Sequence, residues 1–235
     1  MVGIRGIVFD KDGTLIDFER SWVPALVGSA EELAMRAGRP NMAAVMLEAV
    51  GRCPDTGRIL PGSQLAAGTT DVVAAQWRDL VPELPPLQSL IPWIDDYWNR
   101  VGHAHLTPVG DVAGFMSGLS RRGIKLGVAT NDSEAGARQS MSTLGIETLV
   151  DFVAGYDSVA RPKPSPDMIL AFCDAVGLMP GNVAMVGDSV GDLTAGRSAG
   201  CGLVVGVLTG PSDASDLEPY ADFVVTDLHH IADLI

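Results

Sequence analysis

Hydrophobic and polar positions follow two patterns along this chain. Short apolar runs rich in β-branched residues predict buried strands, whereas apolar positions three and four residues apart predict helices. The predicted strands are Ile4–Phe9, Ile124–Thr130, Phe152–Ala154, Val183–Val186, Leu203–Val207 and Phe223–Val225. Helices are predicted between the later strands, and a closing helix after Val225. Strands and helices that alternate at this length form a parallel sheet covered on both faces, so we expect an α/β fold.

Two of these helices have recognisable ends. One should be capped by Asp132 or Ser133 and should stop at Gly145, since glycine accepts the left-handed conformation that ends many helices. The other should begin with Ser165 as its capping residue and Pro166 at its first helical position, where proline costs no hydrogen bond.

Residues 18–106 show helical spacing without the alternating pattern of a strand. The helical segments expected there are Glu31–Ala37, Met42–Val50, Thr70–Leu80 and Leu87–Val101. Trp77, Trp93 and Trp98 fall in this region, and we expect them to form its small hydrophobic core rather than a stacking platform. The chain therefore divides into a predicted α/β core over 1–17 and 107–235 and an all-helical cap domain over 18–106.

Composition and charge narrow the classes of partner. With 235 residues, 47% hydrophobic and 19% charged, the chain can build a full core and is not disordered. The formal net charge of −13, with no basic block, disfavours nucleic acid and anionic membranes. Three scattered cysteines favour a reducing compartment. No signal peptide is predicted and no segment approaches the ~20 apolar residues of a membrane span, so we expect a cytoplasmic protein.

Two aspartates stand where the first predicted strand ends. Asp10 and Asp12 follow that strand, and Gly13 and Thr14 after them suit a tight turn. In an extended chain residues i and i+2 point to the same side, so both carboxylates can face one cleft at the carboxyl end of the strand. A solvated turn rich in aspartate would explain the same residues if no matching groups followed.

Matching groups do follow at later strand ends. Thr130 and Asn131 end one strand where a helix is about to begin, a place suited to binding an anion, although these residue types also simply cap helices. Lys163 stands between two prolines, which fix the backbone and project one cation from the loop before a helix. A merely solvated loop is the alternative for Lys163.

A second acidic pair follows the strand Val183–Val186. Asp188 comes after Gly187, and Asp192 lies four residues further on at the opening of a helix, so the two carboxylates share one side of a turn. Hard oxygen ligands in this arrangement suit Mg²⁺, which takes one or two carboxylates together with a substrate phosphate. The alternative is an aspartate cap with a second acid favoured by the helix dipole.

Taken together, these residues resemble a known family. Asp10-x-Asp12-Gly13-Thr14, Thr130-Asn131, Lys163-Pro164 and Gly187-Asp188-x-x-x-Asp192 look like the motifs of the haloacid dehalogenase superfamily of hydrolases. Their order, their spacing and the helical insertion after the first motif resemble its phosphoglycolate-phosphatase-like members. The resemblance implies a Rossmann-like core with a cap. Arg161 stands where these proteins often have a small residue, so we treat it as an extra phosphate or substrate contact.

The resemblance also implies a role for each matching residue. Asp10 would be the nucleophile that forms an aspartyl-phosphate, and Asp12 would protonate the leaving alkoxide and then deprotonate water. Mg²⁺ would be held by Asp10, the main-chain carbonyl of Asp12, Asp188 and Asp192. The phosphate-binding residues expected are Thr130, Asn131 and Lys163.

We therefore expect a Mg²⁺-dependent phosphatase of a small phosphorylated metabolite, with a cap that excludes bulk water. A sugar phosphomutase shares the whole core and stays open, as does a phosphate-binding regulatory module without turnover. A dehalogenase has no use for Asp12 or a metal, and a phosphonate hydrolase would need a lysine that the cap lacks. Among cap residues Arg20 is the expected substrate contact because it lies nearest the first motif, and the protein is expected to be a monomer or homodimer.

Overall fold

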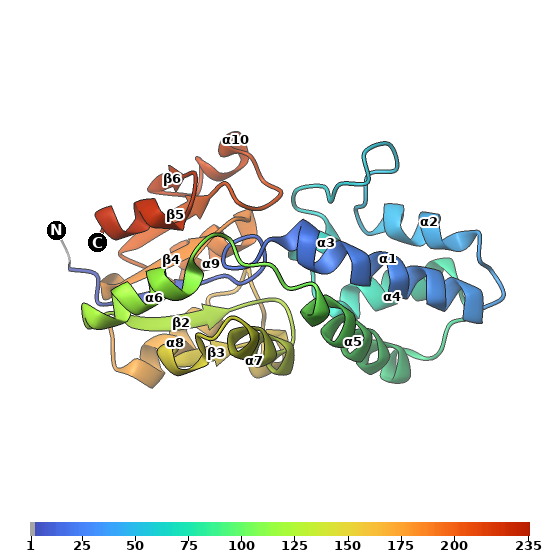
Figure 1. The fold of residues 1–235 in the computed structure, drawn as a ribbon, viewed down its shortest axis with the longest axis horizontal. Coiled ribbons are helices and arrows are strands. Elements are labelled where there is room, and N and C mark those ends of the chain that lie inside the picture. The colour runs from blue at the N-terminus through green and yellow to red at the C-terminus, as the bar shows by residue number, and fades with distance from the viewer. Residues whose placement is uncertain (1–2) are drawn as a thin grey trace. The chain divides into compact units, whose positions relative to one another are not determined.

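The predicted strands form one sheet in which every neighbouring pair is parallel. Its order is β3–β2–β1–β4–β5–β6 (Figure 1). The strands are β1 (Gly6–Phe9), β2 (Lys125–Ala129), β3 (Phe152–Ala154), β4 (Val183–Gly187), β5 (Leu203–Val207) and β6 (Phe223–Val225). The computed structural model describes residues 3–235. The predicted α/β fold with a parallel sheet is confirmed.

Two units make up the chain. One comprises residues up to Asp17 together with Pro108–Ile235, and the other is Phe18–Thr107. The first unit holds the sheet and its helices, which are α6 (Val112–Arg121), α7 (Glu134–Thr143), α8 (Asp167–Val176), α9 (Val190–Ala199) and α10 (Ala214–Leu217). It also holds short 3-10 segments, η1 (Glu147–Leu149), η2 (Tyr156–Ser158), η3 (Pro180–Asn182) and η4 (Leu228–Asp233).

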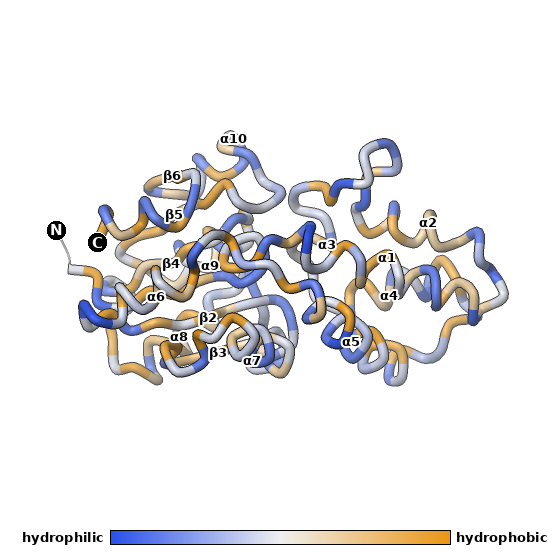
Figure 2. The backbone as a smooth tube through the Cα atoms, viewed as in Figure 1, coloured by the Kyte–Doolittle hydropathy of each residue, from blue (hydrophilic) through white to orange (hydrophobic). Residues whose placement is uncertain are grey.

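Helices cover both faces of the sheet. On one face the ring of Phe172 in α8 lies against Gly6 of β1 and Gly127 of β2, where a Cβ on either glycine would meet the ring at 3.1 or 2.6 Å. On the other face Phe9 contacts Phe115 of α6 edge-on, with ring centroids 6.0 Å apart. β1 is buried along its whole length, and the hydrophobic positions of the strands appear orange in Figure 2. A strand buried on both faces explains its continuous apolar run.

One predicted helix feature of this unit is wrong, and one predicted helix is of the 3-10 type. Helix α8 begins at Asp167 with Pro166 as its N-cap residue, and Ser165 does not cap it. The Ser165 hydroxyl instead donates a hydrogen bond to Asp167 Oδ1 at 2.7 Å. The predicted closing helix is present as a 3-10 helix, η4, and the side chain of its N-cap residue Asp227 accepts from the His229 N–H.

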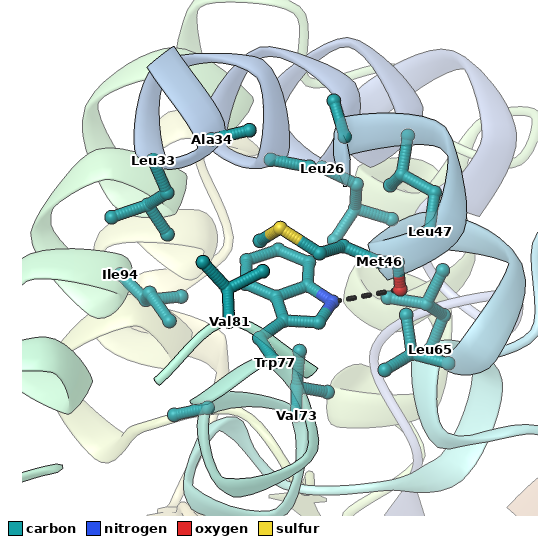
Figure 3. Packing of buried hydrophobic residues seen from close by; sticks show 14 of the residues in the cluster. Leu26, Leu33, Ala34, Met46, Leu47, Leu65, Val73, Trp77, Val81 and Ile94 are labelled. Carbon is teal, nitrogen blue, oxygen red and sulfur yellow. Dashed lines mark hydrogen bonds between the residues drawn. The ribbon is translucent and has the colours of Figure 1, made fainter. Parts of the chain in front are cut away.

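Five helices form the second unit, as the spacing predicted in part. They are α1 (Phe18–Arg36), α2 (Met42–Ala49), α3 (Gln64–Ala67), α4 (Thr70–Leu80) and α5 (Leu87–Ala104). Trp77 is fully buried at the centre, and its indole N–H donates to the Met46 carbonyl at 2.9 Å (Figure 3). Trp93 and Trp98 are partly buried against the same cluster. The tryptophans therefore build the core of this unit, as expected.

Helix α1 begins at Phe18, well before the predicted start at Glu31. Its early turns include Pro24 and the fully buried Ser29, which obscure the apolar spacing. The Ser29 hydroxyl donates to the Leu26 carbonyl and accepts from the Trp98 indole at 2.9 Å, so a polar residue occupies a core position with its hydrogen bonds satisfied.

Among the helices of the described residues, none combines the length and apolar character needed to cross a membrane.

Candidate active site

Three adjacent strands deliver polar side chains to one edge of the sheet. β1 lies between β2 and β4, and Phe9 pairs with Val128 on one side and Val186 on the other. Asp10 follows β1 directly, Thr130 follows β2 and Asp188 follows β4. All three are buried. The parallel register therefore brings together residues that are far apart in the sequence.

Lys163 reaches this edge from the loop before α8. Its Nζ lies 2.5 Å from Asp10 Oδ1 and 2.6 Å from Asp192 Oδ1. The side chains of Lys163, Asp10 and Asp192 are 4%, 8% and 3% exposed, so the ion pairs are shielded from water. Shielded ion pairs are stronger than exposed ones because the local dielectric constant is low. A solvated-loop interpretation of Lys163 does not fit this burial.

Three buried carboxylates gather at the site. Oxygen atoms of Asp10, Asp188 and Asp192 all lie within 4.8 Å of one another. Asp188 accepts a hydrogen bond from the Thr14 hydroxyl at 3.1 Å. Asp192 accepts from the Ser189 N–H at 2.9 Å while Ser189 caps α9, so Asp192 belongs both to the capping box of this helix and to the cluster.

Burial sets the electrostatics of the cluster. Desolvation raises the pKa of Asp10 to about 7; Lys163 opposes this shift, and the carboxylates of Asp192 and Asp12 reinforce it. Burial, with Asp10 and Asp192 nearby, also raises the pKa of Asp188. For Lys163 burial alone would lower the pKa, but Asp10 and Asp192 outweigh it and raise the pKa.

The charge of the cluster fits a divalent cation. When all three carboxylates are ionised, they carry two more negative charges than the Lys163 ammonium can balance in this buried place. Hard carboxylate oxygens at this separation are ligands suited to a hard cation such as Mg²⁺. The chemistry of these donors therefore fits a site for a divalent cation.

Two glycines leave room for the Asp188 carboxylate. Gly13 has φ of 84°, and a Cβ there would lie 2.4 Å from Asp188 Oδ2. A Cβ at Gly210, in the loop after β5, would lie 1.8 Å from the same atom. The neighbouring Thr209 hydroxyl donates to the Gly13 carbonyl at 2.5 Å. Sequence reasoning missed Thr209 and Gly210, although they follow a predicted strand end as the other site residues do.

Thr130 and Asn131 make local contacts in this structure. The Thr130 hydroxyl accepts from the Asp132 N–H at 3.1 Å, which is a turn contact. The Asn131 side chain bonds the main chain of Lys163, with its Nδ2 3.0 Å from the carbonyl and its Oδ1 3.1 Å from the N–H. Binding of a phosphate by either residue stays a prediction.

The remaining predicted residues lie outside the carboxylate cluster. The Asp12 carboxylate accepts from the Lys11 ammonium at 2.9 Å. Arg161 is exposed and pairs with Asp167, with distances of 2.9 and 3.2 Å. Arg20 is exposed on α1 of the helical unit. Their contacts with substrate stay predictions.

Comparison with known proteins agrees with the fold. Residues 4–200 match the family described as haloacid dehalogenase-like hydrolase, and the chain belongs to this family. It is an enzyme, a phosphoric monoester hydrolase of this family.

Relatives resemble the chain along most of its length. A phosphoglycolate phosphatase of Vibrio vulnificus (strain YJ016) is 31% identical over 245 residues, covering 99% of this chain and 96% of the relative. One of Escherichia coli (strain K12) is 28% identical over 208 residues, covering 84% and 79%. The crystal structure of a predicted phosphoglycolate phosphatase from Haemophilus somnus superposes with a TM-score of 0.74 at 22% identity, covering 98% and 97%, and shares the fold.

Proposed function

We propose that this protein is a Mg²⁺-dependent phosphatase that hydrolyses a small phosphomonoester through an aspartyl-phosphate on Asp10. The observation that carries the proposal is the buried pair of Asp10 and Lys163, 2.5 Å apart, beside the carboxylates of Asp188 and Asp192. A nucleophile, a cation for the phosphoryl oxygens and a metal site thus meet in one place.

Asp10 performs the first chemical step in this proposal. One of its carboxylate oxygens attacks phosphorus, a new O–P bond forms, and the ester P–O bond breaks. Asp12 gives a proton to the departing alkoxide, so that the alcohol leaves neutral. Lys163, with Thr130 and Asn131 as predicted partners, binds the phosphoryl oxygens and balances their charge.

The second step regenerates the enzyme. Asp12, now a carboxylate, takes a proton from the attacking water. The water oxygen forms a bond to phosphorus as the O–P bond to Asp10 breaks, which releases inorganic phosphate and restores the Asp10 carboxylate. Asp10, the Asp12 main-chain carbonyl, Asp188 and Asp192 would hold Mg²⁺, which supplies positive charge next to the phosphoryl group when bound.

Phosphoglycolate is the first substrate to test, because relatives aligned along most of the chain bear the name phosphoglycolate phosphatase. Such a substrate carries a carboxylate beside its phosphate and needs a further cation. Arg20 and Arg161 remain the predicted candidates for this contact. A cytoplasmic location and a monomeric or homodimeric state remain predictions as well.

A screen of phosphorylated metabolites with Mg²⁺ tests the proposal by measuring released phosphate. We expect turnover of a small phosphomonoester, its loss on chelation, and its abolition in D10N. Isomerisation of a hexose 1-phosphate without net phosphate release would indicate the mutase instead. Stoichiometric phosphorylation without turnover would indicate a regulatory module, and activity retained in D10N would contradict the nucleophile.

A further inference from the structure

Lys11 lies inside the first motif with its side chain completely buried. Its Nζ is 2.9 Å from Asp12 Oδ1 and 2.7 Å from Asp12 Oδ2, so one ammonium contacts both oxygens of the same carboxylate. The Lys11 side chain is 0% exposed, whereas that of Asp12 is 18% exposed. Lysine is almost never fully buried unless it is paired, so this residue is held in place by its charged partners.

A second carboxylate anchors the same ammonium. Asp132 Oδ2 lies 3.1 Å from Lys11 Nζ. Asp132 is itself fixed at the beginning of α7, because its Oδ1 accepts from the Ser133 N–H at 2.6 Å and its own N–H donates to Thr130 at 3.1 Å. Lys11 therefore ties the Asp12 carboxylate to a rigid position beyond the end of β2.

The main chain around the motif is fixed independently. The Lys11 carbonyl accepts from the N–H groups of Leu15 at 2.9 Å and Ile16 at 3.0 Å. With this turn closed, the remaining freedom of Asp12 is the rotation of its side chain. The contact with Lys11 restricts that rotation.

An ammonium at this place costs desolvation that an apolar side chain would avoid. The ammonium contacts both oxygens of Asp12 and one oxygen of Asp132, so two carboxylates balance its charge. A methionine of similar length would fill the space without a charge. The charge is thus matched to the carboxylates and not required for filling the core.

We propose that Lys11 is a positioning residue that orients the Asp12 carboxylate for proton transfer to the leaving group and from the attacking water. This inference rests on the proposed function, in which Asp12 is the acid and base. The motif alone does not specify a role for the residue between the two aspartates, and the inference assigns one to Lys11. Proton transfer needs the carboxyl oxygen within hydrogen-bond reach of the reacting atom, so a freely rotating Asp12 is a poorer acid.

Two substrates with different leaving groups distinguish a positioning role of Lys11 from a merely structural one. An alkoxide needs a proton to depart, whereas dinitrophenolate leaves without one. The ratio kcat/KM reports the steps through cleavage of the ester bond, so it depends on the acid only for the alkyl substrate. The K11M variant should lower kcat/KM for the best alkyl phosphate by about tenfold or more and change that for dinitrophenyl phosphate by less than about threefold. Dinitrophenolate should appear in a burst, because the second step still needs Asp12 as a base.

Lys125 provides the matched control. It pairs with Asp151 at 2.6 Å but is 51% exposed at the beginning of β2, so K125M removes a lysine–aspartate ion pair by the same substitution without touching the motif. This variant should keep wild-type kcat/KM for both substrates. The D132N variant removes the anchor charge but keeps the acceptor for the Ser133 N–H, and should reproduce the K11M pattern at smaller size.

The possible results separate the inference from the proposed function. Equal losses for both substrates in K11M, or no loss for either, would overturn the positioning role. If K11M fails to fold, as judged by circular dichroism, D132N decides alone by the same ratio of kcat/KM values. Absence of phosphatase activity in the wild type, or activity retained in D10N, would contradict the proposed function instead.

Discussion

The Asn131 side chain and the Lys163 main chain form a pair of hydrogen bonds across 32 residues of sequence. Nδ2 donates to the Lys163 carbonyl at 3.0 Å, and Oδ1 accepts from the Lys163 N–H at 3.1 Å. The pair joins the end of β2 to the loop before α8, and it fixes the backbone from which the Lys163 ammonium reaches Asp10.

Replacing Asn131 by alanine should release that loop. The loss of two hydrogen bonds of about 1 kcal/mol each should lower the free energy of unfolding by about 2 kcal/mol. Displacement of Lys163 should lower kcat at least tenfold, which corresponds to an activation barrier about 1.4 kcal/mol higher. Urea unfolding and steady-state kinetics measure the two effects. The N182A variant is the control, since Asn182 also bonds a distant carbonyl, that of Gly3 at 3.2 Å, away from the site. Equal kcat in N131A and N182A would contradict the role of the pair.

The Asp12→Asn substitution should leave the fold intact and remove proton transfer. General acid–base groups contribute about 10²–10⁴-fold, so kcat for an alkyl phosphate should fall by this factor. D151N serves as the control, because Asp151 is also paired with a lysine but lies at an exposed edge. Circular dichroism should show both variants folded. The melting temperature of D151N should stay close to that of the wild type, whereas that of D12N should fall, because the buried Lys11 ammonium loses one of its two carboxylate partners. A wild-type kcat in D12N would exclude Asp12 as the acid.

The stability of the metal-free protein should depend on pH in an unusual direction. Burial raises the pKa of Asp10 from 3.8 to about 7 and also raises that of Asp188, so the folded state binds more protons than the unfolded one. The stabilisation that comes from these extra protons in the folded state is therefore fully present below about pH 4 and is lost as pH rises through about 7. Thermal unfolding in a chelator should show it, and Mg²⁺ should raise the melting temperature more at pH 8 than at pH 5.

The Asp188→Asn variant isolates the contribution of the Asp188 carboxylate to this pH dependence and to Mg²⁺ binding. It removes one buried charge while its side-chain oxygen keeps the acceptor for the Thr14 hydroxyl. In chelator at pH 8 we expect D188N to be more stable than the wild type, and its response to Mg²⁺ should be lost. A Mg²⁺ response as large as in the wild type would show that Asp188 is not a ligand.

Removing the charge of Lys163 should destabilise the protein strongly. The K163M substitution leaves two buried carboxylates, those of Asp10 and Asp192, without their cation, and such a loss costs about 3–5 kcal/mol. The loss should be smaller at pH 5, where Asp10 takes up a proton. Removing the exposed ion pair in K125M should cost about 1 kcal/mol or less. Similar losses in urea unfolding of both variants would contradict the shielding of the Lys163 pairs.

Gly210 should be sensitive to a single methyl group. In G210A the new Cβ would lie 1.8 Å from Asp188 Oδ2, so the carboxylate must move away from the metal site. We expect the Mg²⁺ concentration for half-maximal activity to rise at least about tenfold, which corresponds to about 1.4 kcal/mol. In the control G181A, where the new Cβ has no atom within 4 Å, the Mg²⁺ titration should match the wild type.

Much of the fold could be predicted because its signals are local. The strands Phe152–Ala154, Leu203–Val207 and Phe223–Val225 are found with the predicted bounds, since short apolar runs mark them clearly. Helix α1 was harder because the buried Ser29 and the internal Pro24 interrupt its apolar face. The cap of α8 was predicted wrongly, because the Ser165 hydroxyl donates to the Asp167 side chain two residues further on and does not accept from a helical N–H.

The order of residues alone was enough to place Asp10, Asp188 and Lys163 at strand ends and loops of one predicted sheet, since parallel strands direct their carboxyl ends to a common edge. Which side chains touch at that edge depends on strand register, side-chain rotamers and burial, which the local sequence does not fix. Only the folded chain therefore showed that Asn131 bonds the Lys163 backbone, that Gly210 makes room for Asp188, and that Lys11 is a buried partner of Asp12.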